Sequence, residues 1–160
     1  MKLIKSILLI TFSLVGLIGC KTNYASRSPL PFYAEEMLYD EGASELLVKT
    51  PAGVMRYGAE GKLIQGPREN LIERFETLKK TSVSKAPASV VDLAQTPLGL
   101  ISYQAQSKSL FISHPNSYPR LILANIEQPK NIVYSRATGR LFLTLESEKA
   151  LLSLILRPSF

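Results

Sequence analysis

The chain has 160 residues, a formal net charge of +6, one cysteine, one histidine and no tryptophan. This length suits one domain, and the single Cys and His provide too few soft ligands for a transition-metal site. With one thiol no internal disulfide can form, so we expect a hydrophobic core to stabilise the fold.

The first 20 residues have the organisation of a secretory signal. Lys2 and Lys5 precede an apolar run, which ends at Leu17-Ile18-Gly19-Cys20. The run has about twelve residues, whereas a bilayer-spanning helix needs about 20. Charge, apolar stretch and small residue in this order are typical of a signal peptide. The last four residues resemble the lipobox of bacterial lipoproteins, which implies cleavage after Gly19 and lipid attachment to the sulfur of Cys20. An ordinary secretory signal followed by a free thiol is the alternative.

The lipoprotein resemblance also implies a location. A single acyl chain holds a protein only marginally, whereas the two or three chains carried by lipoproteins anchor it permanently. An aspartate directly after the cysteine would resemble an inner-membrane retention signal. This chain has Lys21 at that position instead. We therefore expect a protein anchored through Cys20 at the periplasmic face of the outer membrane, in a compartment without nucleic acid.

Acidic and basic residues are unevenly distributed. Five acids lie within residues 35–45, whereas the chain from Leu46 onward has 15 Lys and Arg against 8 Asp and Glu. A basic domain can associate with lipid head groups, cell-wall polymer or an acidic partner, and simple solvation of its charges is the alternative. The acidic cluster lacks the spacing of a calcium-binding loop.

We expect three segments: a signal peptide over residues 1–19, a lipidated N-terminus and tether over residues 20–44, and a β-rich periplasmic domain over residues 45–160. Ser and Pro residues interrupt regular structure in the tether. Its aromatic and aliphatic residues between positions 29 and 41 allow two interpretations. They form a docking segment for a partner, or a strap packed on the surface of the domain itself.

Beyond residue 45, short apolar segments separated by turn residues predict β-strands. These strands are expected at residues 46–48, 54–57, 63–64, 90–92, 98–103, 109–113, 121–124, 132–134, 141–145 and 151–156. Thr138-Gly139 predicts a hairpin turn between two of them. In that hairpin, Leu141 and Leu143 would face one side of the sheet and Phe142 the other.

One segment has helical spacing instead. Residues 67–80 begin with a proline suited to the first helical position, and apolar residues follow at intervals of three and four. Glu76 and Lys80 are four residues apart and would form a stabilising pair. We expect a short helix here, with an amphipathic strand as the alternative.

Hairpin-like segments recur along the chain. A shift of 31 residues aligns 101–103 with 132–134 and 110–113 with 141–144, and a shift of 78 aligns Pro51, Val54 and Leu63 with Pro129, Ile132 and Leu141. The shared unit is a proline, an aliphatic strand, a turn with Gly or Ser and a basic residue, and a strand led by Leu. It resembles the hairpins of NHL and YVTN-type β-propeller blades. A generic antiparallel meander is the alternative.

The length limits any propeller. Blades take about 40–45 residues, so 141 residues hold at most three, fewer than the four that close a ring. We expect a mainly β fold: an antiparallel meander of propeller-like hairpins, either an incomplete propeller or a small sandwich, with one short helix. Open sheet edges invite pairing, so we expect the helix, the 29–41 segment or another chain to cover them.

No motif predicts catalysis. His114, the only histidine, lies in a predicted turn. A Ser-His-Asp triad would need His114 beside Asp40 or Asp92, but the sequence has no Gly-x-Ser-x-Gly motif to supply the serine. Glu73 and Glu76 imitate a glycosidase pair but lie on a predicted surface helix. We therefore expect no enzyme, cofactor or metal, but a structural component that binds another envelope protein within a membrane-associated assembly. A binding module for an anionic envelope polymer or a small ligand is the alternative.

Overall fold

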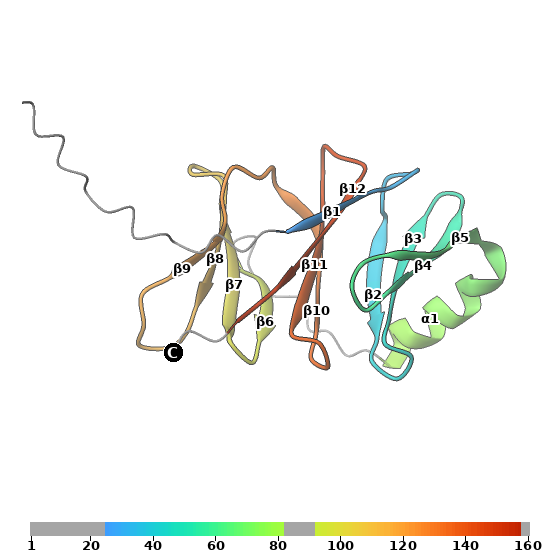
Figure 1. Ribbon diagram of the computed structural model, residues 1–160, viewed down its shortest axis with the longest axis horizontal. Coiled ribbons are helices and arrows are strands. Elements are labelled where there is room, and N and C mark those ends of the chain that lie inside the picture. The colour runs from blue at the N-terminus through green and yellow to red at the C-terminus, as the bar shows by residue number, and fades with distance from the viewer. Residues whose placement is uncertain (1–24, 82–91, 158–160) are drawn as a thin grey trace, which may run out of the picture.

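The computed structural model describes residues 25–81 and 92–157. In these residues, three four-stranded antiparallel sheets lie side by side, with one short α-helix at one end (Figure 1). The expected mainly β fold with a single short helix is confirmed at this level. No helix of the described part is both long and apolar enough to span a membrane.

Sheets B and C are meanders of consecutive strands, whereas sheet A is a meander of the last three strands completed by the first strand of the chain. Sheet A has the order β1 (Ser26–Pro29), β12 (Ala150–Ile155), β11 (Arg140–Leu145) and β10 (Pro129–Ser135). Sheet B has the order β2 (Glu36–Asp40), β3 (Glu45–Thr50), β4 (Gly53–Gly58) and β5 (Leu63–Arg68). Sheet C has the order β6 (Asp92–Thr96), β7 (Gly99–Gln104), β8 (Ser109–Ser113) and β9 (Arg120–Leu123). A 3₁₀ turn, η1 (Glu69–Leu71), leads from β5 into α1 (Ile72–Thr81).

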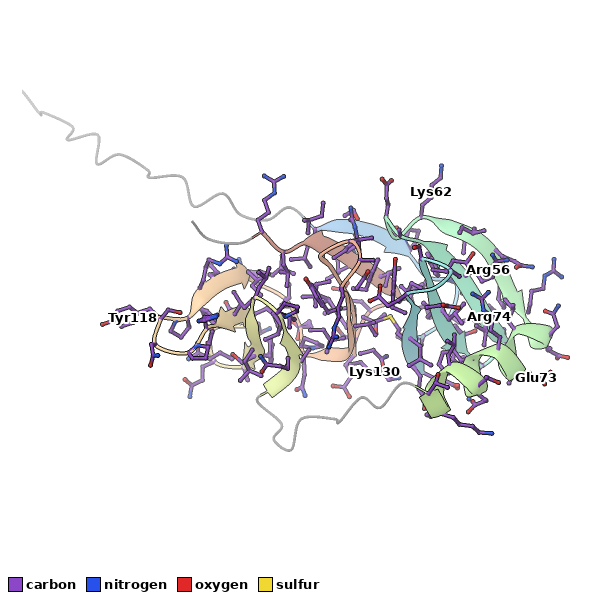
Figure 2. The ribbon with its side chains drawn as sticks, turned by 90° about the horizontal axis from the view of Figure 1, so that it is seen from below. Arg56, Lys62, Glu73, Arg74, Tyr118 and Lys130 are labelled. Carbon is purple, nitrogen blue, oxygen red and sulfur yellow. The ribbon has the colours of Figure 1, made fainter. Side chains whose placement is uncertain are left out.

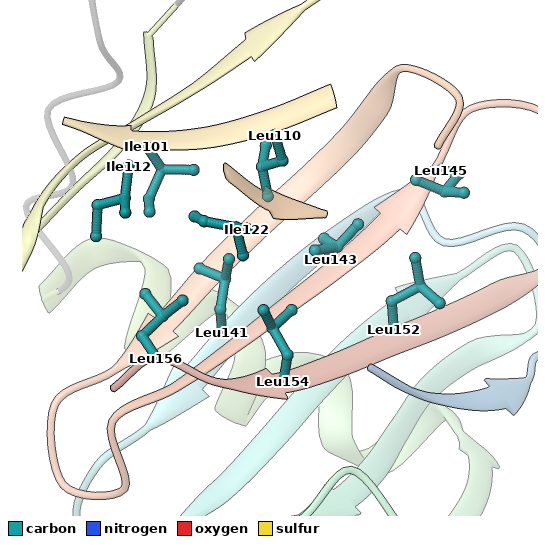
Figure 3. Packing of buried hydrophobic residues seen from close by; sticks show 10 residues of the cluster. All are labelled: Ile101, Leu110, Ile112, Ile122, Leu141, Leu143, Leu145, Leu152, Leu154 and Leu156. Carbon is teal, nitrogen blue, oxygen red and sulfur yellow. The ribbon is translucent and has the colours of Figure 1, made fainter. Parts of the chain in front are cut away.

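Sheet A is the middle layer, and both of its faces are buried. Leu141 and Leu143 pack with aliphatic residues of sheet C (Figure 3), whereas Phe142 packs with buried residues of sheet B. The alternation expected for this hairpin is therefore confirmed. Thr138-Gly139 forms the turn, and Gly139 has a φ of 64°. Strands buried on both faces read as continuous apolar runs, which explains why β11 and β12 are so rich in leucine.

The N-terminal segment belongs to the sheets, which corrects the expected domain boundary at residue 45. β1 pairs antiparallel with β12, and β2 pairs with β3. Leu30, Ala34 and Met37 are buried in the core between sheets A and B. Of the two interpretations of residues 29–41, packing on the domain itself is the one observed. Pro29 is tolerated because β1 is an edge strand, where a missing N–H costs no ladder hydrogen bond.

The helix begins later than expected. Pro67 lies in β5 rather than at the first helical position, and α1 covers only residues 72–81. β5 is also an edge strand, so the proline fits there for the same reason. The main partner of Glu76 is not the expected Lys80: Glu76 accepts a hydrogen bond from Lys49 Nζ of sheet B at 2.8 Å. This hydrogen bond lowers the pKa of Glu76, and the charge of Lys80 contributes a smaller effect in the same direction. Phe75 anchors the helix by packing on Leu47 and Val54.

The sequence repeat corresponds to hairpins rather than to whole sheets. The shift of 31 aligns β7 and β8, the two middle strands of sheet C, with β10 and β11, which include an edge strand of sheet A. Three hairpins share a Tyr paired with a Leu across a four-residue loop: Tyr39 with Leu46, Tyr103 with Leu110 and Tyr134 with Leu141. In each loop the last residue has a positive φ, at Ser44, Lys108 and Gly139. The repeat therefore encodes a loop conformation, typical of hairpins built around a type I turn.

Two strands differ in their bounds from the expected ones, and one of them extends outside the described residues. Residues 90 and 91 of the expected 90–92 strand lie outside the described residues, and β6 begins at Asp92. The expected strand at 121–124 corresponds to β9, which starts at Arg120 and ends at Leu123.

Candidate interaction surfaces

Among the described side chains, those considered for a Ser-His-Asp triad do not form one, and the side chain of Asp92 lies outside the described residues. His114 is exposed in the loop after β8, where its Nδ1 lies 3.1 Å from the carbonyl oxygen of Pro115. Asp40 instead accepts a hydrogen bond from Arg74. Among the described residues, no group of three or more His, Cys, Asp or Glu side chains could hold a metal ion. Cys20, the expected lipidation site, lies outside the described residues.

The acidic cluster forms ion pairs that attach α1 to sheet B. Arg74 Nη2 of the helix lies 2.6 Å from Asp40 Oδ2, and its Nη1 lies 3.1 Å from Glu45 Oε2. Arg56 of β4 also pairs with Glu45 (Figure 2 labels both arginines). The hydrogen bond from Arg74 holds the pKa of Asp40 below its usual value, and that from Arg56 does the same for Glu45. Both carboxylates are therefore charged structural partners rather than proton donors.

Glu41 joins two loops. Its carboxylate accepts hydrogen bonds from the backbone N–H of Arg136 at 2.7 Å and of Ala137 at 3.3 Å, and from the hydroxyl of Ser135 at 3.4 Å. The β2–β3 loop of sheet B is thereby attached to the β10–β11 loop of sheet A. Hydrogen bonds to a carboxylate are charge-assisted, so this contact adds a polar link between the two sheets beside their hydrophobic core.

The two ends of the stack differ. Helix α1 covers the outer face of sheet B, but no described helix or strand covers the outer face of sheet C (Figure 1). Leu100 and Phe111 lie half-buried on that face. Both alternate with core residues along their strands, and this alternation is the sequence signal that predicts their outward direction.

A hollow lies on this outer face of sheet C. It has a volume of about 430 Å³ and is lined by Ser102, Tyr103, Gln104, Phe111 and Pro119. The Tyr103 hydroxyl donates to the carbonyl oxygen of Ile126 at 3.1 Å, so it is already engaged. The Tyr103 ring packs toward the core between sheets A and C, so the outer face offers the ring of Phe111, the hydroxyl of Ser102 and the amide of Gln104. These groups bind by packing and hydrogen bonding, but they include no acid–base pair.

Comparison with known proteins identifies no relative. Neither a protein-family model nor a curated protein nor a solved structure matches the chain.

Proposed function

We propose that this chain is a lipid-anchored protein of the cell envelope, attached through Cys20 at the periplasmic face of the outer membrane. It acts as a non-catalytic interaction component of a membrane-associated assembly. The signal-like N-terminus with its lipobox supports the anchor. The absence of an acid–base or metal constellation among the described residues is compatible with a binding role.

We also propose that sheets A, B and C are blade-type sheets in an open, propeller-like arc. Three features support this proposal. Each sheet is four-stranded and antiparallel, the strands β2 and β6 both contact β10, and the N-terminal β1 completes the sheet made by the last three strands. An arc of three sheets has two open ends, and α1 covers one of them.

The observation that carries the interaction role is the uncovered outer face of sheet C. Every other sheet face in the stack is covered, by a neighbouring sheet or by α1. The outer face of sheet C exposes part of Phe111 and the adjoining hollow. An apolar, concave surface at the end of a stack suits a partner protein that continues the stacking.

Site-specific photo-crosslinking in native membranes tests this role. A photoreactive residue at Gln104, which is exposed and lines the hollow, should crosslink the chain to a second protein. The matched control carries the same residue at Glu73, which is exposed on α1 at the opposite end of the stack. Recovery of uncrosslinked monomer alone from both positions would contradict the proposal.

The anchor has its own test. Cys20→Ser should abolish incorporation of a fatty-acid analogue and leave uncleaved precursor or mislocalised protein. Cys20 is the only cysteine in the chain, so no other thiol can replace it. Unchanged labelling of the Cys20→Ser chain would refute lipidation at this residue.

The hollow favours one alternative, a binding module for an anionic envelope polymer or a small ligand. Its volume of about 430 Å³ lies within the range of small-molecule sites. Saturable binding of purified cell-wall polymer that Phe111→Ala abolishes, together with an absence of protein crosslinks from Gln104, would favour this alternative.

A further inference from the structure

The outer edges of the three sheets form one continuous surface. β2 and β6 both contact β10, so these three edge strands meet on one side of the stack. The opposite edges are β1, β5 and β9. We call these three strands, with the loop before β5, the last residue of β12 (Ile155) and residues 156–157 that follow it, the outer rim. Figure 2 shows Lys62 on the rim side and Lys130 of β10 on the opposite side.

Polar contacts join the three parts of the rim. Ser28 of β1 donates its hydroxyl hydrogen to the carbonyl oxygen of Gly61, just before β5, at 3.2 Å. Arg120 of β9 donates from Nη2 to the carbonyl oxygen of Arg157 at 2.8 Å. The rim therefore extends without interruption from sheet B across sheet A to sheet C.

The rim carries exposed aliphatic side chains. Leu63 is 49% exposed, Ile64 55%, Leu121 42% and Ile155 43%. Isolated apolar residues on a surface need no explanation, but these four belong to strands at the rim. Leu63 and Ile64 lie on the two faces of edge strand β5. Leu121 lies beside Phe111 on the outer face of sheet C, and Ile155 ends β12.

Basic residues accompany the aliphatic ones. The rim and its flanks carry five cations, Arg27, Lys62, Arg68, Arg120 and Arg157, against three acids, Glu60, Glu69 and Glu148. Glu148 is paired with Arg27. By contrast, Asp40 and Glu45 neutralise Arg56 and Arg74 on the opposite part of sheet B. A surface with aliphatic groups between cations is complementary to a bilayer with anionic head groups.

The proposed anchor brings this surface to the membrane. Ser26, the first residue of β1, pairs with Ser153 near the exposed Ile155. Cys20 is five residues before Ala25, so the chain between them spans at most about 18 Å. We propose that the outer rim lies on the anionic phospholipid surface of the membrane and directs the inner edges of the sheets away from it. This inference rests on the lipid anchor of the proposed function.

Fluorescence quenching in vesicles tests the orientation. The full lipidated chain is reconstituted into phosphatidylcholine vesicles with or without phosphatidylglycerol, in the presence of lipids that carry a quencher at the head-group level. Cys20 is the only cysteine, and its thiol is blocked by acylation. A cysteine introduced by Ile64→Cys or Ile155→Cys is therefore the single site on the rim for a fluorophore. Lys130→Cys is the matched control on the opposite edge, and the unsubstituted chain must remain unlabelled.

We expect at least about twofold stronger quenching at positions 64 and 155 than at 130 in vesicles that contain phosphatidylglycerol. Replacing Lys62 and Arg68 by glutamine should weaken that quenching, as should high salt, since salt screens charges beyond about 8–10 Å. Equal quenching at positions 64 and 130 would overturn the orientation. So would quenching at positions 64 and 155 that is the same with and without phosphatidylglycerol. Vesicle flotation of the same samples separates the two proposals. Chains that float without rim quenching overturn only the orientation, whereas chains that do not float overturn the anchor and the orientation with it.

Discussion

Replacing Phe142 by alanine probes the packing between sheets A and B. The Phe142 side chain is fully buried, stacks on the Tyr39 ring with centroids 5.7 Å apart, and packs among the core residues of sheet B. Removing the ring from such a position leaves a cavity that neighbouring strands fill only partly. We expect a loss of about 3–5 kcal/mol in the free energy of unfolding.

Two comparison variants make the result interpretable. Leu141→Ala removes a fully buried side chain from the opposite face of the same strand and should cost about 2–5 kcal/mol. Phe111→Ala removes the same atoms as Phe142→Ala, but from a half-buried position on the outer face of sheet C. Because no enclosed cavity forms there, its cost should be about 1 kcal/mol.

Urea unfolding followed by circular dichroism measures all three variants. The slope of the free energy against urea should stay constant, so that the midpoints report stability. At about 4 °C per kcal/mol, Phe142→Ala should lower the melting temperature by about 12–20 °C. If Phe142→Ala costs no more than Phe111→Ala, sheets A and B are not packed together at this position, and the three-layer description is refuted.

Two further predictions concern a turn and the acid range. Gly99→Ala places a Cβ 2.4 Å from the carbonyl oxygen of Ser113 at a φ of +130°, so it should cost about 2–4 kcal/mol in thermal unfolding. Gly66→Ala is the control: its Cβ would meet no atom within 4 Å, so it should change the free energy of unfolding by less than about 0.5 kcal/mol. Equal losses of stability in the Gly99→Ala and Gly66→Ala chains would contradict the β7–β8 geometry. Arg74 lowers the pKa of folded Asp40, so this stabilisation is present above the unfolded pKa of about 4 and is lost as the pH falls through the folded value. Asp40→Asn should therefore lower the free energy of unfolding by about 1–3 kcal/mol at pH 7 and by progressively less at lower pH. If the substitution lowers the free energy of unfolding as much at pH 3 as at pH 7, the Asp40–Arg74 pair does not stabilise the fold as proposed.

The sequence alone was sufficient to predict which side chains share a face. Successive residues of a strand point to opposite sides, so Leu141 and Leu143 were expected on one face and Phe142 on the other, whereas burial of both faces was seen only in the structure. The spacing of Phe75 with its apolar neighbours implied a helix with one buried side, because a helix turns once every 3.6 residues. These inferences succeed because they depend on local backbone geometry alone.

Element boundaries and ion pairs needed the tertiary structure. Pro67 suits the start of a helix and the edge of a sheet equally well, and only the pairing of β5 with β4 decides between them. The acidic cluster looked like a charged tether because its cations follow later in the chain: Arg56 is 11 residues from Glu45, and Arg74 is 34 residues from Asp40. No local pattern joins such partners.

Only the tertiary structure decided how the sheets are assembled. Ser26 and Ser153 lie 127 residues apart, yet they face each other in sheet A. A short edge strand such as β1 has few apolar residues, so its own sequence does not specify a neighbour. Its place is set by the exposed edge of β12 and by the burial of Leu30 and Ala34 that follows. That single pairing also places the start of β1 on the outer rim, because β1 joins the free edge of β12, whereas the free edge of β10 lies on the side where β2 and β6 contact it.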